Sequence, residues 1–123
     1  MNMGEQPMEI PQNLQEQLGK LQQSQQTLQV ITSQKQQVEM ELAEMDKALE
    51  ELTKSPDDAV LYQSIGMLLV KKTKDSILKD LSEKKELLNV RSSVLGKQEE
   101  RIKTQFKELQ QQLQTKLRQQ PPS

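Results

Sequence analysis

Apolar residues recur every seven positions over residues 12–53, in two columns that stand three residues apart. The first column reads Leu14, Leu21, Leu28, Lys35, Leu42 and Leu49, and the second reads Gln17, Ser24, Ile31, Val38, Met45 and Leu52. Two apolar columns at this spacing form the seam of a coiled coil. Gln17 and Ser24 interrupt the second column near the N-terminus. We therefore expect a long helix over residues 10–53 that packs tightly in its second half and loosely in its first.

A second heptad pattern runs over residues 75–118. Its clear column reads Leu81, Leu88, Leu95, Ile102 and Leu109. The column that we assign beside it is mostly polar and reads Ile77, Lys84, Arg91, Gln98 and Gln105. Four apolar side chains widen the face in places: Leu87, Val94, Phe106 and Leu113. Two helices of similar length, joined by residues 54–74, fold back most simply as an antiparallel pair.

The joint between the two helical patterns contains a helix break and two short apolar runs. Ser55-Pro56-Asp57-Asp58 predicts a break followed by a short helical turn, because serine caps helices and proline suits a first helical position. The runs Val60–Ser64 and Met67–Lys71 then flank Ile65-Gly66. Glycine readily adopts the positive φ of a tight turn, so this segment predicts a β-hairpin. Either Thr73 or Asp75 can cap the second helix.

The predicted hairpin is apolar on both faces. A two-stranded hairpin alone is marginal in water, and both of its edges carry unpaired backbone groups. Two thin helices can cover only part of one face. We therefore interpret the segment as an assembly module that pairs with strands of other chains, through Val60, Leu61, Tyr62, Ile65, Gly66, Met67, Leu68, Leu69 and Val70.

Composition separates this chain from an ordinary globular domain. Only 33% of its residues are hydrophobic and 2% are aromatic, too few for a compact core. The formal net charge is −1 and the leucines are periodic, which favours an extended coiled coil over disorder. With a net charge of −1, the chain has no excess of basic residues to form the surface that nucleic-acid binding requires. We therefore expect no nucleic-acid partner.

The chemistry of enzymes and metal sites is absent from the sequence. The chain has no histidine and no cysteine, which excludes a histidine-based triad, a thiolate nucleophile and a cysteine-based zinc site. Gly19, Gly66 and Gly96 do not form a phosphate-binding pattern. We expect no enzyme activity, no catalytic residues, no metal and no cofactor.

The N-terminal segment and the lack of long apolar stretches indicate where the chain resides. The opening MNMGEQPMEIPQ lacks the apolar stretch of a signal peptide, and no window is apolar enough to span a membrane. We expect a cytoplasmic protein with no membrane partner.

Methionine and leucine gather where the two arms end, within and next to the segments 1–9 and 119–123, which we expect to be flexible. Such side chains adapt to apolar partners of varied shape, as a binder of unfolded proteins requires. We expect these tips to hold client proteins through Met1, Met3, Met8, Ile10, Leu14, Leu18, Phe106, Leu113 and Leu117. A plainer interpretation stays open for four leucines, which could simply complete the coiled coil: Leu14, Leu21, Leu109 and Leu113.

Several segments in this order resemble the archaeal-type beta subunit of the prefoldin family. They are IPQNLQ at residues 10–15, VEMELAEMDKALEEL at 38–52, SPDDA at 55–59, VLYQSIGMLLVKK at 60–72 and KQEERIKTQFKELQ at 97–110. The resemblance covers roughly residues 10–115. Met67 departs from the polar residue expected after the turn glycine, so the turn type stays open.

The resemblance implies a fold, a set of partners and a function. The fold is mostly α, with two long helices in an antiparallel coiled coil and one central β-hairpin that assembles into an intersubunit β-barrel. The partners are two alpha-type subunits and further copies of this chain, four beta-type subunits in all, in a hetero-hexamer. The function is ATP-independent binding of unfolded proteins and their transfer to a group II chaperonin. The alternative is a structural coiled-coil scaffold without client binding, which would need no apolar hairpin.

Overall fold

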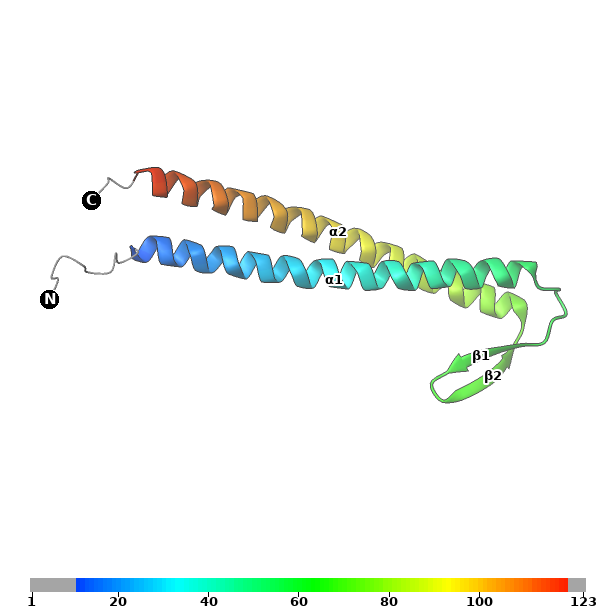
Figure 1. Cartoon of the computed structure of the whole chain (residues 1–123). Coiled ribbons are helices and arrows are strands. Elements are labelled where there is room, and N and C mark those ends of the chain that lie inside the picture. Colours follow the sequence, from blue (N-terminus) through cyan, green and yellow to red (C-terminus); the bar gives the residue numbers. More distant parts are fainter. Residues whose placement is uncertain (1–10, 120–123) are drawn as a thin grey trace. The chain divides into compact units, whose positions relative to one another are not determined.

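A computed structural model describes residues 11–119 of the chain. Helix α1 spans Gln12–Lys54, strands β1 (Leu61–Ile65) and β2 (Leu68–Lys72) follow, and helix α2 spans Lys74–Gln119 (Figure 1). The prediction of two long helices with one hairpin between them is confirmed. The described residues divide into two compact units. We call residues 32–97 the hairpin unit, and residues 11–31 together with 98–119 the terminal unit.

Helix α1 forms because glutamine, glutamate, lysine and leucine dominate its 43 residues, and all four are good helix formers. Its first turn is closed by the Pro11 carbonyl, which accepts hydrogen bonds from the backbone N–H groups of Leu14 and Gln15 at 2.9 and 3.0 Å. Every residue of its two heptad columns is buried or half-buried. The predicted α1 seam is therefore confirmed, including its polar members.

Helix α2 begins after Thr73, whose hydroxyl accepts a hydrogen bond from the Ser76 N–H at 3.2 Å. Thr73, rather than Asp75, is thus the capping residue. The column from Leu81 to Leu109 is buried or half-buried as predicted. The column assigned beside it is wrong at three of its five positions, because Lys84, Arg91 and Gln105 are exposed, whereas Ile77 is buried and Gln98 is half-buried. The side chains that pack there are instead Leu78, Lys85, Ser92, Glu99, Phe106 and Leu113.

The error in the second column of α2 has a physical cause. Lys85, Ser92 and Glu99 are polar, so hydrophobicity alone gives no signal at these seam positions. Lys85 forms an ion pair with Asp46 of α1 inside the hairpin unit, which satisfies its charge. Glu99 is 8% exposed, and its carboxylate lies 3.4 Å from the Lys103 ammonium.

The hairpin pairs β1 and β2 in an antiparallel register, from Leu61 opposite Lys72 to Ile65 opposite Leu68. Gly66 and Met67 therefore form its two-residue turn, one residue later than the sequence predicted. Gly66 has a φ of 57° and no residue other than glycine has a positive φ in the described part of the chain. A positive φ at the first central position alone defines a type II′ turn, which needs glycine there and suits the twist of the strands.

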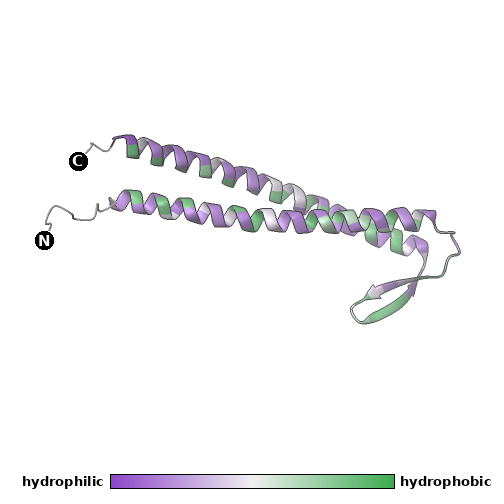
Figure 2. Cartoon of the chain, in the orientation of Figure 1, coloured by the Kyte–Doolittle hydropathy of each residue, from purple (hydrophilic) through white to green (hydrophobic). Residues whose placement is uncertain are grey.

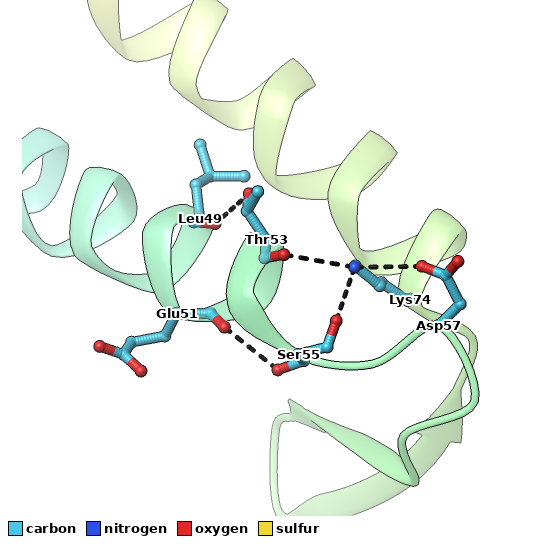
Figure 3. Close-up of polar contacts among 6 residues, drawn as sticks. All are labelled: Leu49, Glu51, Thr53, Ser55, Asp57 and Lys74. Carbon is cyan, nitrogen blue, oxygen red and sulfur yellow. Dashed lines mark hydrogen bonds and ion pairs between the residues drawn. The ribbon is translucent and has the colours of Figure 1, made fainter.

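The joint between α1 and β1 differs from the short helical turn that was expected. The Ser55 hydroxyl does not cap a new helix, because it donates back to the Glu51 carbonyl at 3.1 Å (Figure 3). A single turn follows, in which the Ala59 N–H donates to the Pro56 carbonyl at 3.0 Å. The proline here stops α1 and shapes this turn.

Lys74 connects three parts of the hairpin unit (Figure 3). Its ammonium donates to the Ser55 carbonyl at 2.7 Å, to an Asp57 carboxylate oxygen at 3.2 Å and to the Thr53 carbonyl at 3.5 Å. The side chain is only 13% exposed. All three ammonium donors are thus used, and a positive charge stands at the C-terminal end of α1, where the helix dipole favours it.

We expect Lys74→Met to lower the free energy of unfolding by about 1–3 kcal/mol, because it leaves the carbonyl groups at the end of α1 without their charged donor. Urea titration followed by helical circular dichroism measures this loss. Lys79→Met, on an exposed position of the same helix, is the control and should change stability little. Equal losses in the two variants would contradict the role of the Lys74 contacts.

Candidate functional site

The hairpin presents two faces of different exposure. One face carries Leu61, Gln63, Ile65, Leu68, Val70 and Lys72, and the other carries Tyr62, Ser64, Leu69 and Lys71. On the first face four side chains are half-buried: Leu61, Gln63, Val70 and Lys72. Every side chain of the second face is exposed. The chain itself therefore covers only part of one face.

Large apolar side chains are exposed over most of the hairpin, and Figure 2 shows hydrophobic colour along β2 and the turn. The exposed fractions are Val60 63%, Tyr62 60%, Ile65 49%, Met67 102%, Leu68 67% and Leu69 74%. Contiguous exposed apolar surface of this kind marks an interaction site. The sheet has two strands, so each strand has one unpaired edge within the described residues.

Gln63 adds a polar group to this surface. Its side-chain oxygen is buried and has no hydrogen-bond partner within residues 11–119. Val70 stands opposite it in the sheet and offers no side-chain donor. A buried acceptor without a donor costs about 1–3 kcal/mol, so this position gains stability from any donor that another chain supplies.

The residues predicted to bind clients differ in how far they are exposed to solvent. Leu14 is 3% exposed, so it is buried and does not offer a surface. Leu18, Phe106 and Leu113 are half-buried, and only Leu117, at 55%, is exposed. The remaining four lie outside the described residues: Met1, Met3, Met8 and Ile10. For Leu14 the structure favours the interpretation as a packing residue.

The terminal unit contains an open groove that sequence reasoning missed. One part, of about 420 Å³, is lined by Lys20, Gln23, Ser24, Thr27, Ile102, Gln105, Glu108, Leu109 and Gln112. A second part, of about 450 Å³, is lined by Gln17, Glu108, Gln111, Gln112, Thr115, Lys116 and Gln119. Glu108 and Gln112 line both parts. We call the two parts together the terminal groove.

Most of the groove lining falls on one stripe of each helix. The α1 stripe is Gln17, Lys20, Ser24 and Thr27, and the α2 stripe is Gln105, Glu108, Gln112, Thr115 and Gln119. Successive members are three or four residues apart, which places them on one face of their helix. The signal that could have found this groove is the presence of Gln17 and Ser24 at seam positions, where a leucine would fill the space between the helices.

Metal-ligand clusters and membrane-spanning helices are both absent from the described residues. Within residues 11–119 no three histidine, cysteine, aspartate or glutamate side chains are grouped so that they could hold a metal ion. No helix in this range is long and apolar enough to cross a bilayer.

Two long helices joined by one β-hairpin whose apolar strands are largely uncovered define the class of fold to which this chain belongs. A family model described as "Prefoldin subunit" matches residues 15–120. The chain is 46% identical to the prefoldin subunit beta of Thermococcus kodakarensis and 47% identical to that of Pyrococcus furiosus, each over 93% of this chain and 96% of the relative.

A solved structure supports the same assignment. The crystal structure of the prefoldin beta subunit from Thermococcus strain KS-1 is similar with a TM-score of 0.83 at 46% identity, over 93% of this chain and 98% of that one. The chain belongs to the prefoldin family, whose members are chaperone subunits, and its relatives here are beta subunits.

We expect Leu69→Asp to prevent assembly with other prefoldin subunits while leaving the helices folded. The side chain is 74% exposed in the single chain, so the substitution costs little there. Burying an unpaired carboxylate in an interface costs several kcal/mol. Sedimentation and native mass measurement of the co-expressed subunits should show unassembled chains.

The control is Met40→Asp, which also adds a charge at an exposed apolar position of the hairpin unit but lies on α1. This variant should assemble normally. A normal complex from Leu69→Asp would contradict an interfacial position for this strand.

Proposed function

We propose that this chain is a beta-type subunit of an ATP-independent chaperone that holds unfolded proteins in the cytoplasm. Its hairpin joins those of two alpha-type subunits and further copies of this chain in intersubunit β-barrels, with four beta-type subunits in the hexamer. Its helices bind exposed apolar segments of non-native clients, and the complex passes these clients to a group II chaperonin. The proposal rests on membership in the prefoldin family together with the terminal groove.

The hairpin supports the assembly part of the proposal. Its apolar residues are exposed on one face completely and on the other partly, and among residues 11–119 one edge of each strand is unpaired. Strands from other subunits would cover the faces and pair the edges at once. Leu69 stands on the wholly exposed face, and Leu68 and Ile65 extend the apolar surface on the other.

The terminal groove supports the client-binding part. Gln17 and Ser24 occupy seam positions where larger apolar residues would close the helix pair, and the groove lies beside them. Ile102 and Leu109 contribute apolar surface to it. An open, partly apolar groove suits partners that have no fixed shape, because it requires no rigid complementarity.

Client binding is expected to weaken when residues 1–9 are removed and Leu117 is replaced by Ser. These changes remove exposed or terminal apolar groups and keep both seams and the hairpin. The complex should assemble and melt as before, but its binding of a chemically unfolded client should fall several-fold, because each buried apolar side chain contributes about 1.5–3 kcal/mol. Light scattering of an aggregating client measures the loss.

The matched control for this variant is Leu87→Ser, which removes a leucine that is 70% exposed but lies on α2 in the hairpin unit. It should suppress client aggregation like the unmodified complex. If the terminal variant also retained full suppression, the clients would be held elsewhere and the assignment to the chain ends would be wrong.

Nucleotide should have no effect on this activity. Neither helix carries a glycine-rich phosphate loop, since Gly19 and Gly96 lie within α1 and α2. We expect suppression of client aggregation by the purified complex to be the same with and without ATP and magnesium. A several-fold gain on adding ATP and magnesium to the complex alone would contradict an ATP-independent mechanism.

A further inference from the structure

The hairpin is supported at its base and free at its tip. On its partly covered face, the two residue pairs nearest the joint are half-buried, whereas the pair nearest the turn, Ile65 and Leu68, is exposed. The other face is exposed throughout. Packing therefore supports only the base of the hairpin, and the contacts at the joint decide the direction in which its tip points.

The chain enters and leaves the hairpin through two unequal connections. Residues 55–60 join α1 to β1, and Thr73 alone joins β2 to α2. Thr73 is held to α2, because its hydroxyl accepts a hydrogen bond from the Ser76 N–H at 3.2 Å and its carbonyl accepts one from the Ile77 N–H at 3.1 Å. A single attachment still allows the hairpin to tilt, so one direction requires a second fixed point on the longer connection.

Lys74 supplies that second point (Figure 3). Its ammonium donates to the Ser55 carbonyl at 2.7 Å and to the Asp57 carboxylate at 3.2 Å, and both acceptors belong to the longer connection. The Thr53 carbonyl, at the end of α1, lies 3.5 Å from the same ammonium. The first residue of α2 is thus tied to the segment that leads into β1, and both strands start from fixed positions.

The helix that carries Lys74 gives no reason of its own for a lysine there. A positive charge in the first turn of a helix opposes the helix dipole, whereas the same charge at the C-terminal end of α1 is favourable. The Asp57 side chain is fully exposed, so its ion pair contributes little. The contacts of Lys74 with the Ser55 and Thr53 carbonyls therefore account for the lysine.

We propose that Lys74 is a positioning residue for assembly: its ammonium fixes the direction of the hairpin relative to the helices, and this direction selects one closed complex. The inference rests on the assembly part of the proposed function and adds the residue that prepares the hairpin for it. Every subunit of a closed complex repeats its own geometry, so an angle that varies between copies prevents closure and yields open or mixed oligomers.

The length of the strands makes the angle at the joint decisive. Each strand has five residues, or about 17 Å at 3.3–3.4 Å per residue. A tilt of about 10° at the base moves the tip by about 3 Å, which is more than half of the 4.7–4.9 Å between paired strands. Hydrogen bonds between strands are lost at smaller displacements than this. A loss of order at Lys74 is therefore amplified where the hairpin meets other subunits.

The test compares Lys74→Met with Val38→Ala in the full complex with its partner subunits. Both variants should lose stability, the first through carbonyl groups left without their donor and the second through a cavity in the seam, where Val38 is 3% exposed. Native mass measurement is made at a temperature where both keep full helical circular dichroism. Lys74→Met should show an at least fivefold smaller fraction of the defined complex and a spread of other sizes, whereas Val38→Ala should keep the single complex. Equal behaviour of the two variants would overturn the proposal.

Chemical restoration of the ammonium separates its role from that of the side-chain stem. The chain has no cysteine, so Lys74→Cys gives it a single thiol. Alkylation of the unfolded chain with 2-bromoethylamine forms a carbon–sulfur bond, releases bromide and leaves an ammonium at nearly the length of lysine. The alkylated chain, refolded with its partner subunits, should recover the defined complex, while the unalkylated chain should give the mixed sizes of Lys74→Met. No difference between the two would contradict a role for the ammonium.

The direction of the hairpin can be measured within one chain. Met67→Cys and Glu86→Cys place spin labels at the exposed turn and at an exposed position of α2 in the same unit. The labelled chain is diluted with unlabelled chain, so that only distances within one chain are recorded. Double electron–electron resonance should give a distance distribution at least twice as broad when Lys74→Met is added. An unchanged width would show that Lys74 does not set the direction.

The outcomes separate this inference from the proposed function. If the unmodified subunits form the defined complex and Lys74→Met forms it in the same proportion, assembly through the hairpin stands and the positioning role is wrong. If the unmodified chain and its partner subunits form no defined complex, the assembly part of the proposed function itself fails.

Discussion

A sheet of two strands leaves backbone groups unpaired at both of its edges, and the organisation of this chain follows from that constraint. β1 and β2 bond to each other along one edge only, and their residues are apolar on both faces. Water cannot replace the missing apolar contacts, and two slender helices cannot cover both faces. A two-stranded hairpin alone is marginally stable in water, so this one gains stability from any strand that pairs with its edges.

Polar residues in the coiled-coil seam have two different consequences. Lys85 in the hairpin unit is satisfied by Asp46 across the helix pair, so packing continues around it. Gln17 in the terminal unit borders an open groove, and its buried side-chain oxygen has no hydrogen-bond partner within residues 11–119. A polar residue in the seam is thus paired across the helices in the hairpin unit, whereas in the terminal unit it borders an open groove.

The elements could be predicted from the sequence, while the site could be predicted only in part. Heptad spacing located α1 and its seam, and Gly66 located the turn to within one residue. The seam of α2 was misassigned because Lys85, Ser92 and Glu99 give no hydrophobic signal. The groove was missed for a related reason: it is lined by glutamines, which in sequence look like any solvated helix face. Only the packing of two helices shows which glutamines flank a space.

The bonds of Lys74 have a consequence for the order in which the chain folds. Its contact with Ser55 closes a loop of only 19 residues, whereas the groove is lined by residues as far apart in sequence as Gln17 and Gln119. Short loops cost less entropy to close, so contacts at the joint form early and pairing of the helices proceeds from there toward the termini. By the same argument, the helix pair opens first near the termini and last at the joint. The terminal unit is then the part that separates most readily, and a partner that must enter between or beside the helices meets the lowest resistance there.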